Sequence, residues 1–253
     1  MEVSYNLVLI MVSFAIAVSG SFMALITTRN ALTRDPKNRG GLVFLAALCL
    51  GGVAIWSMHF IGMMAFNLHG TEVDFLGHGA AINYNWPLTV VSFFVGVVVV
   101  YIGLSIMCHG RFNFARLLMS GTFVGLGVAA MHDTGMLAMH VQADLSWNWQ
   151  IVAASVGIAV VAANVALWLA IHVKRLSHIF GSAFIMGLAV CGMHYTGMAA
   201  AGFTHNPTLP TVSSMSGSSS ILVFCIMAID LGVVFVGALM AFSESYRQQL
   251  SVD

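Results

Sequence analysis

The chain carries one six-residue pattern three times, Met-His-x-x-Gly-Met, at residues 58–63, 131–136 and 193–198. Each copy lies near the same end of a long apolar run. One buried Met-His pair is ordinary packing, whereas three copies at equivalent depth predict a site assembled from three helices. Imidazole and thioether groups are the ligands of a copper centre more than the groups of an acid–base enzyme. The pattern therefore predicts a metal centre.

Helical spacing ranks the candidate ligands. Residues i and i+4 share a helix face, so each histidine aligns with the methionine that ends its copy. In the second copy the same stripe would continue to His140, one turn farther on. The methionine before each histidine lies about 100° round the helix and is a weaker candidate. The candidate metal ligands are His59, His132 and His194, then Met63, Met136 and Met198, and last Met58, Met131 and Met193.

A glycine follows each histidine three residues later, at Gly62, Gly135 and Gly197. Glycine removes the side chain beside the histidine, and small residues let membrane helices approach closely. Three ligands that converge from three helices would need such an approach.

The choice of metal follows from the ligand types. Thioethers favour Cu⁺, and imidazole also suits Cu²⁺. Zinc would leave the methionines unexplained, because it prefers thiolate, imidazole or carboxylate. Haem stays open as an alternative, since histidine and methionine are both axial ligands. A dry site with an open coordination position could bind oxygen, carbon monoxide or nitric oxide.

Two plainer interpretations also stay open. Methionine commonly fills gaps in apolar cores, so any single methionine here is a packing candidate. A lone histidine in a membrane more often bonds a neighbouring carbonyl or hydroxyl than a metal. The threefold repetition favours metal or haem binding over both.

The composition shows which elements must position these groups. The chain has 253 residues, of which 59% are apolar and 7% charged, whereas soluble domains are about a quarter charged. Spanning a bilayer takes about 20 apolar residues, and only helices satisfy their own backbone there. The sequence predicts an all-α integral membrane domain over residues 1–253 with seven transmembrane helices, at approximately 5–28, 41–66, 86–107, 115–140, 149–172, 178–202 and 219–243.

The basic residues predict the orientation of the bundle. All nine lie in alternate connections or after the last helix, namely Arg29, Arg34, Lys37, Arg39, Arg111, Arg116, Lys174, Arg175 and Arg247. By the positive-inside rule the N-terminus lies outside and the C-terminus is cytoplasmic. Each histidine follows a basic residue of its own helix start by 16 to 20 residues, which puts it roughly 24–30 Å away, near the outer leaflet. The repeat unit would be a helical hairpin copied three times in parallel, with a seventh helix appended.

Other features add smaller expectations. The net charge is zero, so no nucleic-acid partner is expected. The four cysteines have no regular spacing and are interpreted as buried thiols. The N-terminus lacks a basic segment typical of a cleavable signal, so the first apolar run is expected to stay as a helix. Gly121 and Gly125 permit close packing within or between subunits, which leaves a homo-oligomer open.

Two carboxylates fall inside predicted helices, and such groups are functional candidates. Asp133 would orient His194 or bond Tyr195, while Asp230 in the seventh helix would pair with Asn164. Outer loops carry groups that would either capture a metal or be plain solvated residues: His69, His78, His205, Glu72, Asp74 and Asp144. An aromatic belt at the outer boundary is expected from Trp56, Trp86, Trp147 and Trp149.

The third copy reads Met193-His194-Tyr195-Thr196, and the whole pattern resembles the MHYT domain, a bacterial integral-membrane sensor module. The resemblance covers nearly the full chain. It implies a multi-pass protein of the bacterial inner membrane, a copper site, and sensing of oxygen, carbon monoxide or nitric oxide. It also implies a cytoplasmic output, since such modules are often fused to diguanylate cyclase, phosphodiesterase or DNA-binding domains. The first two copies depart from the literal motif, with Phe60-Ile61 and Asp133-Thr134.

Three function classes follow. The favoured one is a membrane sensor that binds copper, detects a diatomic gas or redox state, and signals to a cytoplasmic partner through the seventh helix. A transporter or chaperone for copper or another small cation should instead show ligands along the full membrane depth or broken helices near the midplane. A haem- or copper-dependent membrane redox enzyme is the third, and no nucleophile–base pair supports it.

Overall fold

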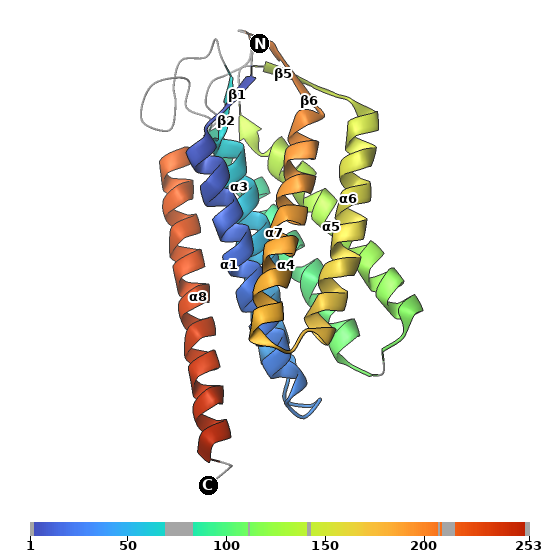
Figure 1. Cartoon of the computed structure of the whole chain (residues 1–253). Helices are drawn as coiled ribbons and strands as arrows, with labels where there is room; N and C mark the ends of the chain where they lie inside the picture. The colour runs from blue at the N-terminus through green and yellow to red at the C-terminus, as the bar shows by residue number, and fades with distance from the viewer. Residues whose placement is uncertain are drawn as a thin grey trace.

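The computed structural model describes residues 3–68, 83–110, 112–140, 143–206, 208 and 216–250, and it shows a helical bundle (Figure 1). Within these residues seven helical stretches are long and apolar enough to cross a membrane. The predicted count and order of spans are therefore confirmed. The spans are α1 (Leu7–Leu32), a composite second span (Gly40–Met64), α4 (Trp86–Cys108), α5 (Phe114–Leu137), α6 (Trp149–His172), α7 (Leu176–Ala199) and residues Ile221–Leu239 of α8 (Ser219–Leu250).

Asparagine starts four of these helices. The first backbone N–H groups of a helix have no partner within the helix, and an asparagine side chain can accept from them. Each of these side chains accepts from a backbone N–H two or three residues later, which fixes where α1, α4, α5 and α6 begin. The four residues are Asn6, Asn85, Asn113 and Asn148.

The second span is not a single α-helix. It consists of α2 (Gly40–Ala47), a π-helix η1 (Leu48–Ser57) and α3 (Met58–Met64). The π-helix ends at the residue before the first Met-His pair. A π-helix is wider than an α-helix and is frequent at functional sites. Its longer turn changes which faces of the following residues point into the bundle.

The second span is also the centre of the bundle. In its most apolar window 78% of the residues are buried, against 17% in α8. It packs on α1 and α4, while α4, α5, α6 and α7 follow one another as neighbours and α7 returns to α1. Helix α8 lies along α1 and η1 at the edge (Figure 1). Its large side chains, such as Phe224, Leu231 and Phe235, point outward, as expected for a helix that faces lipid.

Short strands cover the end of the bundle that also holds the N-terminus (Figure 1). They form three small antiparallel sheets: β1 (Val3–Tyr5) with β2 (Phe66–Leu68), β3 (Asn83–Asn85) between β4 (Met139–His140) and β7 (Ser216–Ser218), and β5 (Ala143–Trp147) with β6 (Ala201–His205). The all-α class is thus correct for the spans and incomplete at this end. Strand pairing satisfies backbone groups where the helices stop.

These strands correct two expectations. Helix α5 ends at Leu137, and His140 lies in β4 opposite Asn83. The predicted helical stripe from His132 to His140 is therefore wrong. Trp56 does not belong to an outer aromatic belt, because it is buried and its indole N–H donates to Ser92 Oγ at 3.0 Å.

The glycines of α5 serve packing within the chain. A Cβ on Gly125 would lie 2.5 Å from Val160 Cα, and one on Gly121 would meet the Asn164 side chain. Both glycines therefore face α6 of the same molecule. The candidate loop ligands His69, His78, Glu72 and Asp74, together with Arg111, lie outside the described residues, as do the side chains of His205 and Arg247. The orientation in the membrane stays a prediction from the basic residues.

The α5–α6 contact makes a prediction about stability. Gly125→Ala should destabilise the bundle by about 1–3 kcal/mol, because overpacking against backbone forces the helices apart. The measurement is thermal or denaturant unfolding in detergent. The matched control is Gly157→Ala in α6, whose added Cβ would meet no described atom within 4 Å. Equal stability of the two variants would contradict the close approach.

Candidate metal centre

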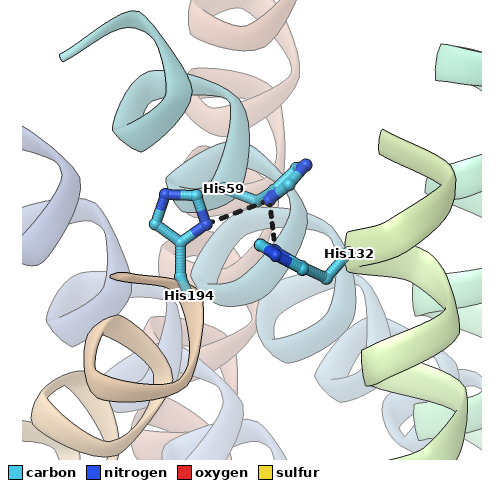
Figure 2. Close-up of side chains that lie close together, drawn as sticks. All are labelled: His59, His132 and His194. Carbon is cyan, nitrogen blue, oxygen red and sulfur yellow. Dashed lines mark hydrogen bonds between the residues drawn. The ribbon is translucent and has the colours of Figure 1, made fainter. Parts of the chain in front are cut away.

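The three motif histidines meet in the core of the bundle, although they lie far apart in sequence (Figure 2). His59 comes from α3, His132 from α5 and His194 from α7. The Nδ1 atom of His59 lies 3.1 Å from Nδ1 of His194 and 3.1 Å from Nδ1 of His132. One nitrogen from each ring can be chosen so that all three lie within 4.8 Å of one another. The structure thus brings together the three residues that the repeated motif singled out.

The cluster is closed to solvent. His59, His132 and His194 are 1%, 2% and 0% exposed. Aromatic side chains connect the cluster to strand β3: Phe60 packs edge-on against His59 at a centroid distance of 4.9 Å, and Tyr84 of β3 packs edge-on against Phe60 at 5.4 Å. Tyr84 lies outside the helices, and burial raises the pKa of its hydroxyl well above its ordinary value.

The motif glycines explain how three rings fit in one place. Each ring turns its Nε2 atom toward the glycine of another copy: His194 toward Gly62, His59 toward Gly135, and His132 toward Gly197. A Cβ at any of these glycines would come closer to that nitrogen than the 3.0 Å that real Cβ atoms keep. The Met-His-x-x-Gly-Met motifs therefore pack reciprocally, because the glycine of each motif leaves space for the histidine ring of another.

The three neutral rings have too few N–H groups and lone pairs at the centre of the cluster to satisfy both Nδ1 contacts with hydrogen bonds. A ring nitrogen carries either one hydrogen or one lone pair. Nδ1 of His59 faces two other Nδ1 atoms, so neutral rings cannot give both contacts a full hydrogen bond. The Nε2 atoms on the other side of each ring are not satisfied either, because in the described structure all three are buried without a hydrogen-bond partner. A cation between the three Nδ1 lone pairs would remove this conflict.

The distances also suit a bound metal. Imidazole nitrogens bind zinc-sized ions at about 2.0–2.1 Å, so two nitrogens on one ion lie about 3.3–3.6 Å apart in tetrahedral or trigonal geometry. The two distances from His59 Nδ1, both 3.1 Å, are only a few tenths of an ångström shorter, and one nitrogen from each of the three rings lies within 4.8 Å of the others. A modest rearrangement of the rings would therefore turn this cluster into a three-nitrogen metal site.

The six motif methionines are all buried. Five of them belong to one apolar core cluster, namely Met63, Met131, Met136, Met193 and Met198. Met58 packs instead with Ala17 and Cys191. Burial therefore does not rank the methionines, and thioether ligation stays a prediction.

Both carboxylates have different neighbours from those expected. The Tyr195 hydroxyl shares a hydrogen bond with Ser13 Oγ at 2.9 Å, so it is not the partner of Asp133. Asp133 lies instead beside His132, Ser155 and Trp147 around a small cavity.

Asp230 accepts a hydrogen bond from Ser57 Oγ at 2.7 Å. The predicted partner Asn164 donates to the carbonyl of Val160 in its own helix. Ser57 was not predicted as a functional residue. The sequence feature that could have indicated it is a hydroxyl residue directly before the first motif, within an apolar run.

Comparison with known proteins places the chain in a family. The model of the MHYT family, described as "Bacterial signalling protein N terminal repeat", matches residues 52–120 and 125–183, together just over half of the chain. These ranges contain the first two motif copies. The third copy, at 193–198, lies beyond them, and the structure brings its histidine to the same centre.

Curated signalling proteins show the same relationship. The chain is 35% identical over 207 residues to the bifunctional diguanylate cyclase/cyclic di-GMP phosphodiesterase MucR of Pseudomonas aeruginosa, covering 79% of this chain and 28% of MucR. It is 30% identical over 213 residues to the cyclic di-GMP phosphodiesterase NbdA of the same organism, covering 81% of this chain and 26% of NbdA. The signaling protein YkoW of Bacillus subtilis is 30% identical over 245 residues, covering 91% of this chain and 29% of YkoW.

The chain thus spans between a quarter and three tenths of the length of these relatives. No solved structure matches it. The family match over half of the chain and the signalling relatives agree with the motif and the seven spans. The chain belongs to the MHYT family of bacterial signalling proteins.

Proposed function

We propose that this chain is a membrane sensor module whose three-histidine cluster holds copper and, through it, detects a diatomic gas or the redox state outside the cytoplasm. The observation that carries the proposal is the convergence of three buried Nδ1 atoms that neutral rings cannot satisfy. The family contributes the signalling role. Bound copper would supply an open coordination position or a redox change.

The chemistry of the donors favours copper. Three neutral imidazoles bring no negative charge, and the other donors that every copy of the motif contains are soft thioethers, which suit Cu⁺. A structural zinc site is usually completed by thiolate or carboxylate. Haem would need a slot for its macrocycle, whereas the Nδ1 atoms of two ring pairs here already lie 3.1 Å apart in a closed core. The three histidines would hold the ion, and their glycine partners would fix the ring orientations.

The position of the cluster favours sensing over transport. A transport path needs ligands at several depths. Among the described residues, the histidine cluster is the one group of three or more His, Cys, Asp or Glu side chains close enough to hold a metal, and it lies at a single level. A site at one level is suited to holding an ion rather than passing it on.

A route to the cytoplasmic side is available through α8. Ser57, the last residue of the π-helix, lies two positions before His59 and donates to Asp230 of α8. Helix α8 is otherwise the least buried span, so this hydrogen bond is a specific link between the cluster and a lightly packed helix. A shift of His59 on binding would change the Ser57–Asp230 contact and with it the position of α8. The output partner would be of the kind named in the longer relatives, a cyclic di-GMP enzyme domain.

The direct test compares the wild type with the triple variant His59→Ala, His132→Ala and His194→Ala by metal analysis and absorption spectroscopy. The wild type should carry near-stoichiometric copper and the variant should lose it. A Soret band that depends on the three histidines would indicate haem instead. A correctly folded wild type with neither copper nor a chromophore would contradict the proposal.

The packing of each histidine ring against a motif glycine predicts that substituting that glycine lowers metal affinity. Gly135→Ala should weaken Cu²⁺ binding by about tenfold or more, because the added Cβ displaces the His59 ring, and supporting groups around ligands are typically worth about 10–100-fold. Affinity is measured by competition with a chromophoric chelator. Gly192→Ala is the control, since its Cβ would meet no described atom within 4 Å although it lies two residues from His194. Equal losses in the two variants would rule out ring placement as the cause.

The link to α8 is tested by distance measurements between spin labels. Cys225 on α8 is exposed, whereas Cys49, Cys108 and Cys191 are buried, so one nitroxide goes on Cys225 and the other on α5 at Met119→Cys, which is 75% exposed. Loading with diamagnetic Cu⁺ should shift the distance distribution in the wild type. Ser57→Ala should remove most of this shift, because the hydrogen bond to Asp230 is lost.

The control for this experiment is Ser19→Ala, whose hydroxyl bonds only the Ile16 carbonyl one turn back, as far as the described residues show. It should leave the Cu⁺-dependent shift unchanged. A full shift in Ser57→Ala would show that the signal does not pass through this contact.

A further inference from the structure

The three motif copies are alike in packing but differ at the residue after each histidine. Phe60 is fully buried against Trp56 and Tyr84, and Tyr195 is tied to Ser13. The second copy has Asp133 at this position. It is half-buried, and it is the one carboxylate among the three equivalent positions. The site is therefore threefold in its ligands and asymmetric in its charge.

Asp133 borders a small cavity next to the cluster. The lining includes His132, Asp133, Ser155, Trp147 and Gly197. His132 turns its Nε2 toward Gly197, and within the described structure this atom is buried without a partner. The cavity volume is about 10 Å³, at the lower limit of the roughly 10–15 Å³ that one water molecule needs. It has room for one small ion in passage but not for a hydrated metal or an organic ligand.

Trp147 also lines an open groove at the strand-covered end. The groove is lined by Trp147 itself, by the neighbouring Ser146, Asn148 and Trp149, and by residues 199–202 at the end of α7 and the start of β6. Trp147 is the residue common to both linings, so its side chain borders both the open groove and the space beside His132.

The geometry points to an access route for the cation, from the open groove past Trp147 to Asp133 and then to His132. This inference rests on the proposed function, because it describes how the ion would reach the three histidines. Asp133 would be a transit ligand and Trp147 the gate, and neither would be part of the final coordination.

Charge gives the physical reason for a carboxylate on this path. Neutral imidazoles exert little long-range attraction on a cation, and an ion that enters the bundle loses its water. A carboxylate at the mouth of a low-dielectric cavity concentrates cations there and raises the association rate, an effect that reaches about 10–1,000-fold in clefts lined by charges of one sign. Once the ion is bound between the Nδ1 atoms, the same carboxylate lies outside its shell. Asp133 should therefore control the rate of loading more than the affinity.

The test follows Cu²⁺ binding to the full chain by stopped-flow quenching of tryptophan fluorescence, and measures affinity separately by chelator competition. Asp133→Asn keeps the size of the side chain and removes its charge. We expect the association rate at low salt to fall about tenfold or more, with the affinity changed much less. The loading rate of the wild type should fall with salt, and that of Asp133→Asn should depend on salt much less.

Two further variants separate the route from general effects. Asp144→Asn removes an exposed charge at the same end, where the carboxylate accepts from Asn206 Nδ2 at 3.0 Å, and it should leave the rate nearly unchanged. Trp147→Phe replaces the gate side chain by a smaller apolar one, and it should raise both the association rate and the dissociation rate of Cu²⁺.

The outcomes are distinct. A wild type that binds Cu²⁺ and an Asp133→Asn variant that loads equally fast would overturn the access route and leave the histidine site standing. Equal slowing by Asp133→Asn and Asp144→Asn would also overturn it, since the effect would then be one of overall surface charge. A wild type that binds no copper would overturn the route together with the proposed function.

Discussion

The close packing of three imidazole rings against three glycines is the constraint on which this bundle depends. Each ring occupies the space where a neighbouring motif would otherwise place a Cβ. The helices that carry His59, His132 and His194 must therefore approach one another at one level, and a side chain at any motif glycine would separate them. The rest of the fold serves this meeting point. The π-helix before Met58 sets the face of the first motif, and the strands and aromatic rings close the end of the bundle above it.

The same packing leaves imidazole nitrogens of the cluster without full hydrogen bonding. Three Nδ1 atoms face one another, and the opposite nitrogens are buried without partners in the described structure. A cation that entered the centre of this cluster would change the ring positions and relieve the conflict between them. A sensor needs two states that a ligand stabilises differently. In the proposed sensor the ring cluster would offer the ligand contact, and the hydrogen bond from Ser57 to Asp230 links it to the least buried span.

Much of this could be predicted from sequence, for identifiable reasons. The seven spans follow from apolar length, and the convergence of the histidines follows from the threefold repetition of Met-His-x-x-Gly-Met. The role of the glycines as space for neighbouring helices was also predictable, although not which histidine each would admit. The π-helix was not, because a wider turn leaves no mark in a uniformly apolar run. The short strands depend on partners from distant segments, as the pairing of His140 with Asn83 shows. The predicted hydrogen-bond partner of Asp230 was also wrong, because it is Ser57 rather than Asn164. The rotation of a helix about its axis in a bundle cannot be inferred from the depth of its residues alone.

X-ray absorption spectroscopy at the copper edge of the copper-loaded protein would test the metal centre most directly. Copper held by the three histidines should give first-shell scattering from nitrogen at about 2.0 Å, with the outer-shell signature of imidazole fitted by three rings. An additional sulfur shell would identify thioether ligation by the i+4 methionines. A first shell of oxygen, or an imidazole count that stays the same when the three motif histidines are replaced, would contradict a copper centre built from His59, His132 and His194.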